Sequence, residues 1–289
     1  MINLEYLAKP FQFEDYEIFK NNASEILTDI VFMYFEDKPM FQAENLNFFF
    51  YDEYTINTLV KPNTYFNFYV EINQPRNYKL NNINKKNKLI PDTHLTLKEI
   101  KKGLFDLCVN NFGSETLIWQ EKYSVNLKIT TYEENTEVVY YIKIIPCFTH
   151  FNSNGKSGII YYDNDKKFIE IEYPDLSILN YNKKNKETKG LFEKYVVLFK
   201  NLYLDNHKKA YIPFELFEIM LYNVPNQLFV SLSTNNLVQI LNYIRNKNIK
   251  EYLSLDEQDN AYVSKYKSYS VIYIKYLISQ IEKLVKSLR

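Results

Sequence analysis

Apolar residues recur at helical spacing near the start of the chain and again through its last hundred residues. Between residues 13 and 35 they follow the period of an α-helix, and the pattern stops before Pro39. Further helices are expected at 188–203, 213–222, 234–249 and 263–288, with a polar, lysine-rich loop at 182–190. The C-terminal part of the chain is therefore predicted to be mostly helical.

Alternating apolar and polar residues predict β-strands in the first half of the chain. Strand regions are expected at 46–51, 65–72, 124–131 and 137–145. Pro146 is expected to close the last of these, because proline has no N–H to donate to a sheet. Between the strands, residues 74–92 lack periodicity and predict a solvated loop, while a capping box of Thr96 and Glu99 predicts a helix to about Asn111.

The segment 65–72 combines a polar and an apolar face. Its alternation places Tyr65, Asn67, Tyr69 and Glu71 on one side, and Phe66, Phe68, Val70 and Ile72 on the other. We expect a half-buried strand with a polar face.

The order of these elements predicts an α+β protein in which a mixed sheet is followed by a helical bundle. At 289 residues and 34.8 kDa, the chain is long enough for one large domain or two closely joined lobes. We expect residues 1–175 to form a core with a long N-terminal helix, and residues 176–289 to form a helical lobe in the same compact unit.

Composition excludes some function classes. With 35 basic and 35 acidic side chains, no global field attracts nucleic acid or a membrane, so any polyanion site must be local. We interpret the 27 Tyr and 21 Phe as base-composition bias of an AT-rich genome rather than as stacking platforms. Neither a signal peptide nor an apolar run of about 20 residues is present, and we expect a cytoplasmic protein.

Cysteine and histidine spacing gives no metal motif. Cys108 and Cys147 lie in apolar surroundings without CxxC spacing, which predicts buried thiols in a reducing compartment. His94, His150 and His207 lack HxxxH or HExxH spacing, and we expect them at surface or loop positions.

Three segments resemble bacterial CD-NTases, relatives of cyclic GMP-AMP synthase and oligoadenylate synthetase. IPFELFEIMLYNVPNQLF at 212–229 resembles the family helix P-S-Y-x-I-E-x-L-L-Y-N-V-P, and FEKYVVLFKNLY at 192–203 resembles F-x-x-x-V-R-L-L-K-x-W. YIKIIPCF at 141–148 resembles the strand h-x-D-V-V-P-A-F that carries the third catalytic acid. The resemblance implies a polymerase beta-like nucleotidyltransferase sheet with a long N-terminal helix, packed on a C-terminal helical bundle.

The resemblance also implies a chemistry whose acids this sequence lacks. The family attacks the α-phosphate of a nucleoside triphosphate with a hydroxyl, assisted by two divalent metals on three carboxylates. Asn67 takes one position of the acid pair, Tyr69 or Tyr65 takes the other, and Lys143 takes the position of the third acid. Asn and Tyr do not supply the charge that holds two magnesium ions, and a lysine places a cation where a metal should lie.

The nucleotide-binding positions are altered as well. DEYTINT at 52–58 takes the place of G-S-Y-A-x-G-T, so that Asp52 replaces the glycine, Glu53 replaces the serine, and Thr58 keeps its type. Phe214 stands where the family has a serine facing the nucleotide. Lys200 matches the lysine that would reach a triphosphate, although a surface position on its helix is the alternative. Thr58, Lys200 and Phe214 are the candidates for nucleotide binding.

These substitutions lead to three hypotheses. The first is an inactive nucleotidyltransferase-like protein without a cofactor, acting as a regulatory subunit that binds a nucleotide, an RNA, an active nucleotidyltransferase or another protein. In it, Lys143 neutralises a bound phosphate or pairs with a carboxylate. The second is an active enzyme that binds Mg or Mn and a nucleoside triphosphate through Asp52, Glu53 and Glu71. The third is a structural or antagonist protein whose cleft is plugged by Tyr65, Tyr69 and Phe214.

Overall fold

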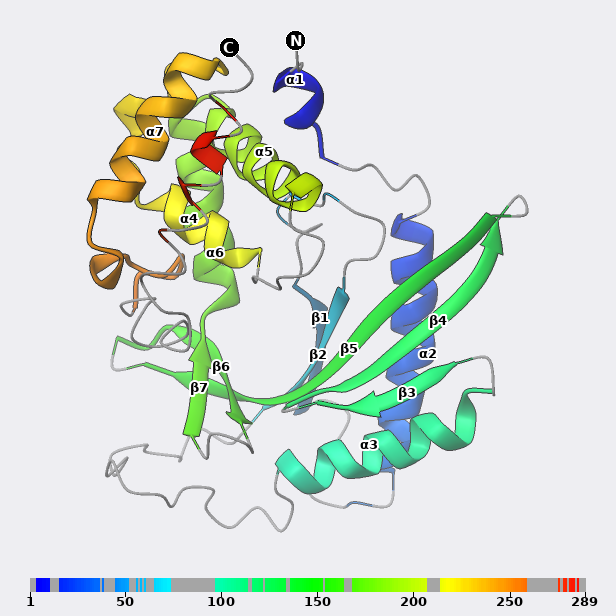
Figure 1. The fold of residues 1–289 in the computed structure, drawn as a ribbon. Coiled ribbons are helices and arrows are strands. Elements are labelled where there is room, and N and C mark those ends of the chain that lie inside the picture. The colour runs from blue at the N-terminus through cyan, green and yellow to red at the C-terminus, as the bar shows by residue number, and fades with distance from the viewer. Residues whose placement is uncertain are drawn as a thin grey trace. The chain divides into compact units, whose positions relative to one another are not determined.

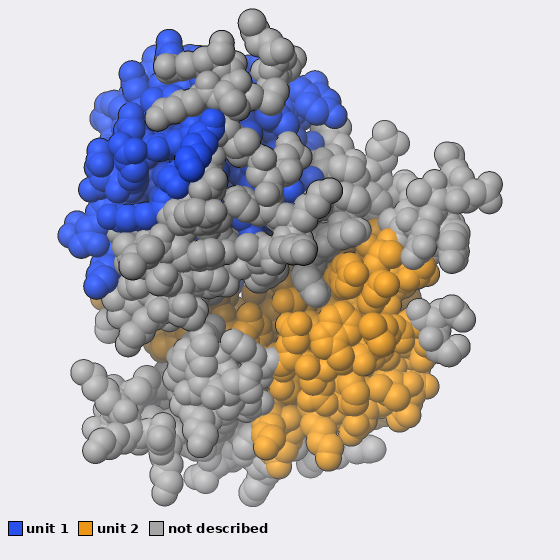
Figure 2. Space-filling view, viewed as in Figure 1, with its two compact units in different colours: residues 1–11, 56–60, 174–289 blue, residues 12–55, 61–173 orange. Residues whose placement is uncertain are grey.

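The computed structural model describes 4–10, 16–36, 38, 45–51, 56, 58, 60, 65–73, 97–113, 116–121, 123–133, 136–152, 154–163, 168–206, 214–258, 275, 278–279, 281–283 and 285. The chain divides into two compact units, coloured orange and blue in Figure 2. Residues 12–55 and 61–173 form the sheet unit, and residues 1–11, 56–60 and 174–289 form the helical unit. The short segments 1–11 and 56–60, which the sequence placed with residues 1–175, thus belong with the helices.

The sheet unit contains the mixed sheet that the sequence predicted, and the α+β fold class is confirmed. Its strands are β1 (Leu46–Phe50), β2 (Tyr65–Ile72), β3 (Leu117–Gln120), β4 (Val125–Glu133), β5 (Thr136–Phe151), β6 (Ser157–Asp163) and β7 (Phe168–Glu172). Five of them follow the order β1-β2-β5-β4-β3, while β6 pairs with β5 and with β7 (Figure 1). The β2–β5 pair is parallel, and the other described pairs are antiparallel.

Two helices of the sheet unit supply its apolar core. Leu27 and Val31 of α2 (Tyr16–Phe35) and Leu104 of α3 (Leu97–Asn111) are buried in one cluster with Phe68 of β2. Both helices, and β2 with its predicted bounds, are confirmed. The proposed capping residue Thr96 and the expected loop at 74–92 lie outside the described residues.

The expected polar face of β2 is largely buried, which corrects the prediction of a half-buried strand. Tyr69 is 5% exposed and Glu71 is 8% exposed, while Asn67 is partly buried. The Tyr69 ring stacks on Phe49 of β1 with 5.0 Å between centroids, and the Glu71 carboxylate accepts a hydrogen bond of 3.0 Å from Asn47. Pairing with β1 therefore supplies partners that the alternation pattern could not indicate.

The prediction that Pro146 ends a strand is wrong, since β5 continues to Phe151. Pro146 lies where β5 changes neighbours on one edge. There β4 pairs as far as Ile144, and β6 begins to pair at Phe148. Among the described strands none occupies this edge between those two residues, so the sheet tolerates a residue without an N–H.

The helical unit is built from α1 (Leu4–Leu7), α4 (Pro174–Glu187), α5 (Leu191–Asn206), α6 (Glu215–Tyr222) and α7 (Thr234–Asn246). Two 3₁₀ turns, Asn226–Leu228 and Ile249–Glu251, follow α6 and α7. One apolar cluster joins these elements with the buried residues Ile278, Ile281 and Val285 near the C-terminus. Most of the predicted helix 263–288 lies outside the described residues.

The predicted loop at 182–190 is wrong for most of its length, because residues 182–187 end helix α4. The buried face of α4 is polar. Ser177, Tyr181 and Lys184 are buried at helical spacing, followed by Thr188 in the turn. The helix ends at Glu187, and the turn that follows contains Lys189 and Gly190 at positive φ, 55° and 81°. The conformation of Gly190 suits a residue without a side chain. A search for apolar periodicity could not detect this helix.

Candidate functional site

The sheet register places two positions at which the family resemblance expects catalytic acids next to one another. Asn67 of β2 is the partner of Lys143 of β5, and Lys143 is in turn the partner of Asn126 of β4. Paired residues on neighbouring strands project from the same face of a sheet. Asn67, Lys143 and Asn126 therefore form a polar row across three adjacent strands.

Lys143 is held by a carboxylate that the sequence did not identify. Its Nζ lies 3.4 Å from Oε2 of Glu121, the residue that follows β3, and the two side chains are 18% and 43% exposed. The other carboxylate oxygen of Glu121 accepts a 3.3 Å hydrogen bond from Nε1 of Trp119. An exposed pair of this kind stabilises a protein by only about 0–1 kcal/mol. The expectation that Lys143 pairs with a carboxylate is confirmed.

Asn126 contributes a hydrogen-bond donor that lacks an acceptor. The residue is fully buried, and its Oδ1 accepts a 3.1 Å hydrogen bond from Oγ of Ser124. Its Nδ2 has no hydrogen-bond partner in the structure. Leaving such a donor unsatisfied costs about 1–3 kcal/mol. The alternation of polar Ser124 and Asn126 with apolar Val125 was the one sequence signal that could have indicated this position.

The donor set at these positions does not fit the two divalent metals that the family resemblance implies. The amide of Asn67 donates a 3.2 Å hydrogen bond to the carbonyl oxygen of Tyr51, so it anchors the end of β1. Tyr65 and Tyr69, the two candidates for its partner position, have phenol groups, and Lys143 is a cation. Magnesium requires anionic oxygen ligands, which none of the four residues provides.

The structure describes one of the three residues of the alternative metal site. Glu71 is a buried carboxylate next to Cys147 in the register of β2 and β5. Asp52 and Glu53 lie outside the described residues. Among the residues that are described, no group of three His, Cys, Asp or Glu side chains could hold a metal ion. A site formed by Asp52, Glu53 and Glu71 stays a prediction.

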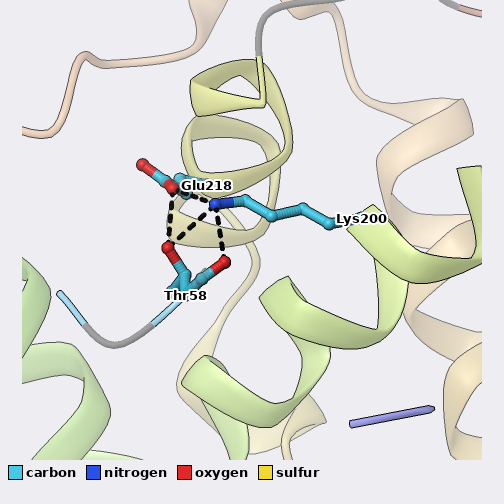
Figure 3. A network of polar contacts seen from close by, with 3 residues as sticks. All are labelled: Thr58, Lys200 and Glu218. Carbon is cyan, nitrogen blue, oxygen red and sulfur yellow. Dashed lines mark hydrogen bonds and ion pairs between the residues drawn. The ribbon is translucent and has the colours of Figure 1, made fainter. Parts of the chain in front are cut away.

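The three nucleotide-binding candidates come together in the helical unit, around a buried ammonium group. Figure 3 shows two of them, Thr58 and Lys200, with their common partner Glu218. Nζ of Lys200 in α5 donates to Oε1 of Glu218 in α6 at 2.6 Å and to Oγ1 of Thr58 at 2.8 Å. The Thr58 hydroxyl donates in turn to Glu218 at 3.2 Å. The Phe214 ring centroid lies 5.6 Å from the same Nζ.

The burial of Lys200 determines which partner its ammonium group contacts. The residue is 0% exposed, so the alternative of a surface lysine is wrong. Its charge is matched by Glu218, which is itself 4% exposed. The ammonium group therefore balances an internal carboxylate instead of facing solvent, where a triphosphate would reach it.

Comparisons with known proteins point to the same family as the sequence motifs. Residues 179–285 match the model of the cGAS/DncV-like nucleotidyltransferase C-terminal helical domain. The chain is also 26% identical over 196 residues to the cyclic nucleotide synthase CdnE01 of Staphylococcus haemolyticus, a match that spans 62% of this chain and 62% of that relative. These matches support the resemblance of the chain to bacterial CD-NTases.

Solved structures show the same fold for this chain. The CdnE cyclic dinucleotide synthase of Elizabethkingia meningoseptica superimposes with a TM-score of 0.72 at 18% identity, covering 98% of this chain and 97% of that chain. The CdnE c-UMP-AMP synthase of Rhodothermus marinus gives 0.69 at 14% identity, covering 98% and 95%. In the described part of this chain, no helix has the length and apolar character needed to cross a membrane.

Proposed function

We propose that this chain is a catalytically inactive protein of the CD-NTase type, and that it acts as a regulatory subunit that binds a nucleotide, an RNA or a protein partner such as an active nucleotidyltransferase. The observation that carries the proposal is the pairing of Asn67 with Lys143 at two positions where the family resemblance expects acids. The named relatives are cyclic nucleotide synthases, whose metal chemistry this donor set does not support.

The charge of Lys143 opposes a metal ion at this place. A unit charge about 4 Å away is repelled by about 4 kcal/mol in the intermediate dielectric near a protein surface, and a divalent ion by about twice that. Pairing with Glu121 offsets part of this repulsion. It does not supply the three carboxylates on which two metals would rest.

Product formation tests the proposal directly. The purified protein is incubated with all four labelled nucleoside triphosphates and magnesium or manganese, with and without RNA and DNA, and the products are separated. We expect no product from the wild type, and none from Lys143→Asp, since one restored acid does not rebuild the site. Metal-dependent incorporation by the wild type would defeat the proposal.

Glu71 gives the active-enzyme hypothesis its one structural support, because its buried carboxylate lies on the same strand face as Asn67. If this hypothesis is right, Glu71→Gln abolishes a product that the wild type makes. Manganese-soaked crystals would then show anomalous scattering beside Glu71. Absence of that signal, together with a silent wild type, would remove this hypothesis.

The stacked and buried Tyr69 supports the third hypothesis, a structural protein with a plugged cleft. A thermal-shift screen with nucleotides separates it from the leading proposal, because a ligand that binds the folded state raises its apparent stability. A nucleotide that raises the melting temperature favours the binding subunit. The plugged protein would show no shift with any nucleotide.

A further inference from the structure

Helix α2 of the sheet unit exposes an apolar stripe with acidic neighbours. Ile18, Ile26 and Met33 are 61%, 51% and 54% exposed, and each lies about two helical turns from the next on one side of the helix. Glu25 and Asp29 are exposed on the same side. Among the described residues, neither carboxylate has an ion-pair partner. Exposed apolar residues bordered by charges of one sign indicate an interaction surface.

Helix α4 of the helical unit exposes the opposite charge. Its Leu179 is 62% exposed, and Lys183 and Lys186 follow it at about one and two turns on the same side. Neither ammonium group has an ion-pair partner within the described part of the chain. This face combines one apolar side chain with two cations, where the α2 face combines apolar side chains with anions.

The two faces match when α2 of one copy lies antiparallel to α4 of another. If Met33 packs on Leu179, then Asp29 falls opposite Lys183, because each charge lies one turn from its apolar neighbour. The antiparallel orientation also places the C-terminal end of one helix beside the N-terminal end of the other, which the helix dipoles favour. Two α2 helices do not match in this way, since both faces are acidic.

The rest of the alignment contains one more attractive pair and a repulsive one. A further turn along the helices brings Glu25 opposite Lys186. At the other end, the exposed Glu36 falls near the exposed Asp175. This contact of like charges weakens the association and provides a position at which a substitution should strengthen it.

We propose that this chain self-associates, with the exposed face of α2 in one copy packed on the exposed face of α4 in another. The contact is heterologous, because two different surfaces meet. Nucleic acid is disfavoured on α2, since the exposed charges there are acidic. The inference goes beyond the proposed function, because association between copies does not depend on whether the protein is inactive.

Sedimentation velocity of the purified chain tests the proposal. The wild type should associate at concentrations up to about 300 µM, because a contact this small is expected to be weak. Association should fall as salt rises. Asp29→Lys and Lys183→Glu should each raise the dissociation constant by about fivefold or more, since each replaces an attractive pair by a repulsive one. Lys102→Glu reverses an exposed charge on α3 and should leave association unchanged.

Mixing the two variants gives the decisive measurement. In an equal mixture of Asp29→Lys and Lys183→Glu, each α2 can meet an α4 of opposite charge, so association should recover toward the wild-type level. A merely structural effect of either substitution would not be reversed by mixing. Glu36→Lys should lower the dissociation constant by about two- to fivefold, because it turns the repulsion with Asp175 into an attraction.

The opposite results would overturn the proposal without touching the proposed function. A wild type that stays monomeric, or a mixture that associates no better than either variant alone, would exclude the contact between α2 and α4. In that event a basic helix of another protein is the occupant left for α2. A labelled product in the incorporation assay would refute the proposed function whatever the sedimentation shows.

Discussion

Replacing Lys200 by methionine should strongly destabilise the helical unit, because it leaves a carboxylate buried without its cation. Lys200 is fully buried, and its ammonium lies 2.6 Å from Glu218 and 2.8 Å from the Thr58 hydroxyl. In Lys200→Met, the 3.2 Å hydrogen bond from Thr58 is the one that Glu218 keeps among the described residues. Removing one partner of a buried ion pair costs about 3–5 kcal/mol, and we expect the free energy of unfolding to fall by that amount.

The same helix offers a matched control for this substitution. Lys194 of α5 pairs with Glu5 at 3.1 Å, and the two side chains are 45% and 60% exposed. Lys194→Met should therefore lower the free energy of unfolding by no more than about 1 kcal/mol. The contrast between the two lysines isolates burial, since the chemical change and the helix are the same.

Urea unfolding followed by far-UV circular dichroism measures these differences by linear extrapolation. The double variant Lys200→Met/Glu218→Leu removes both charges at once. It should recover most of the loss, because replacing a buried pair by apolar residues of similar volume is often neutral. The reasoning would be refuted if Lys200→Met lost no more than Lys194→Met, or if the double variant were less stable than Lys200→Met.

Three further predictions concern buried groups. Desolvation lowers the pKa of the Lys184 ammonium group from 10.5 to about 8. Between these two pH values the unfolded chain therefore binds more protons than the folded chain. The free energy of unfolding should rise with pH across this range by on the order of 3 kcal/mol. Lys184→Met should lack this rise in urea unfolding across that range, and an equal rise in both proteins would contradict the assignment. Gly158→Ala should cost about 1–3 kcal/mol, because its Cβ would lie 2.6 Å from the carbonyl oxygen of Glu172. Gly113→Ala, which meets no atom within 4 Å, is the control, and equal stabilities of the two variants would argue against the clash. Burial raises the pKa of both cysteine thiols, that of Cys108 to about 12, so a thiol reagent should modify them only after unfolding. Rapid labelling of the folded protein would show that the thiols are accessible.

The sequence by itself determined the fold class, a family resemblance and several elements. The helices α2 and α3 and the strand β2 have long or regular patterns, and their bounds were predicted to within a few residues. Resemblance at 212–229 was enough to indicate the family, because that segment keeps the residues that build the helical unit. The resemblance also indicated, without a structure, that Asn67 and Lys143 stand at positions where acids are expected.

Other elements could not be predicted from the sequence, because they depend on buried polar residues or on strand pairing. Helix α4 presents Tyr181 and Lys184 to the interior, and an apolar period does not register such a face. Strands β3, β6 and β7 were not predicted, since a strand is stabilised by its pairing with neighbours, which a local pattern does not show. The same dependence on pairing lets β5 continue through Pro146.

Only the tertiary structure decided which charges meet. It paired Asn67 with Lys143 in the sheet register and placed the Lys143 ammonium group next to the carboxylate of Glu121. No sequence motif had indicated Glu121. It also buried Lys200 on Glu218, where an exposed lysine was one expectation. A sequence states the charge of each side chain, but the register of strands and the packing of helices join residues far apart in the chain. The free energy of each ion pair depends on the burial that this packing produces.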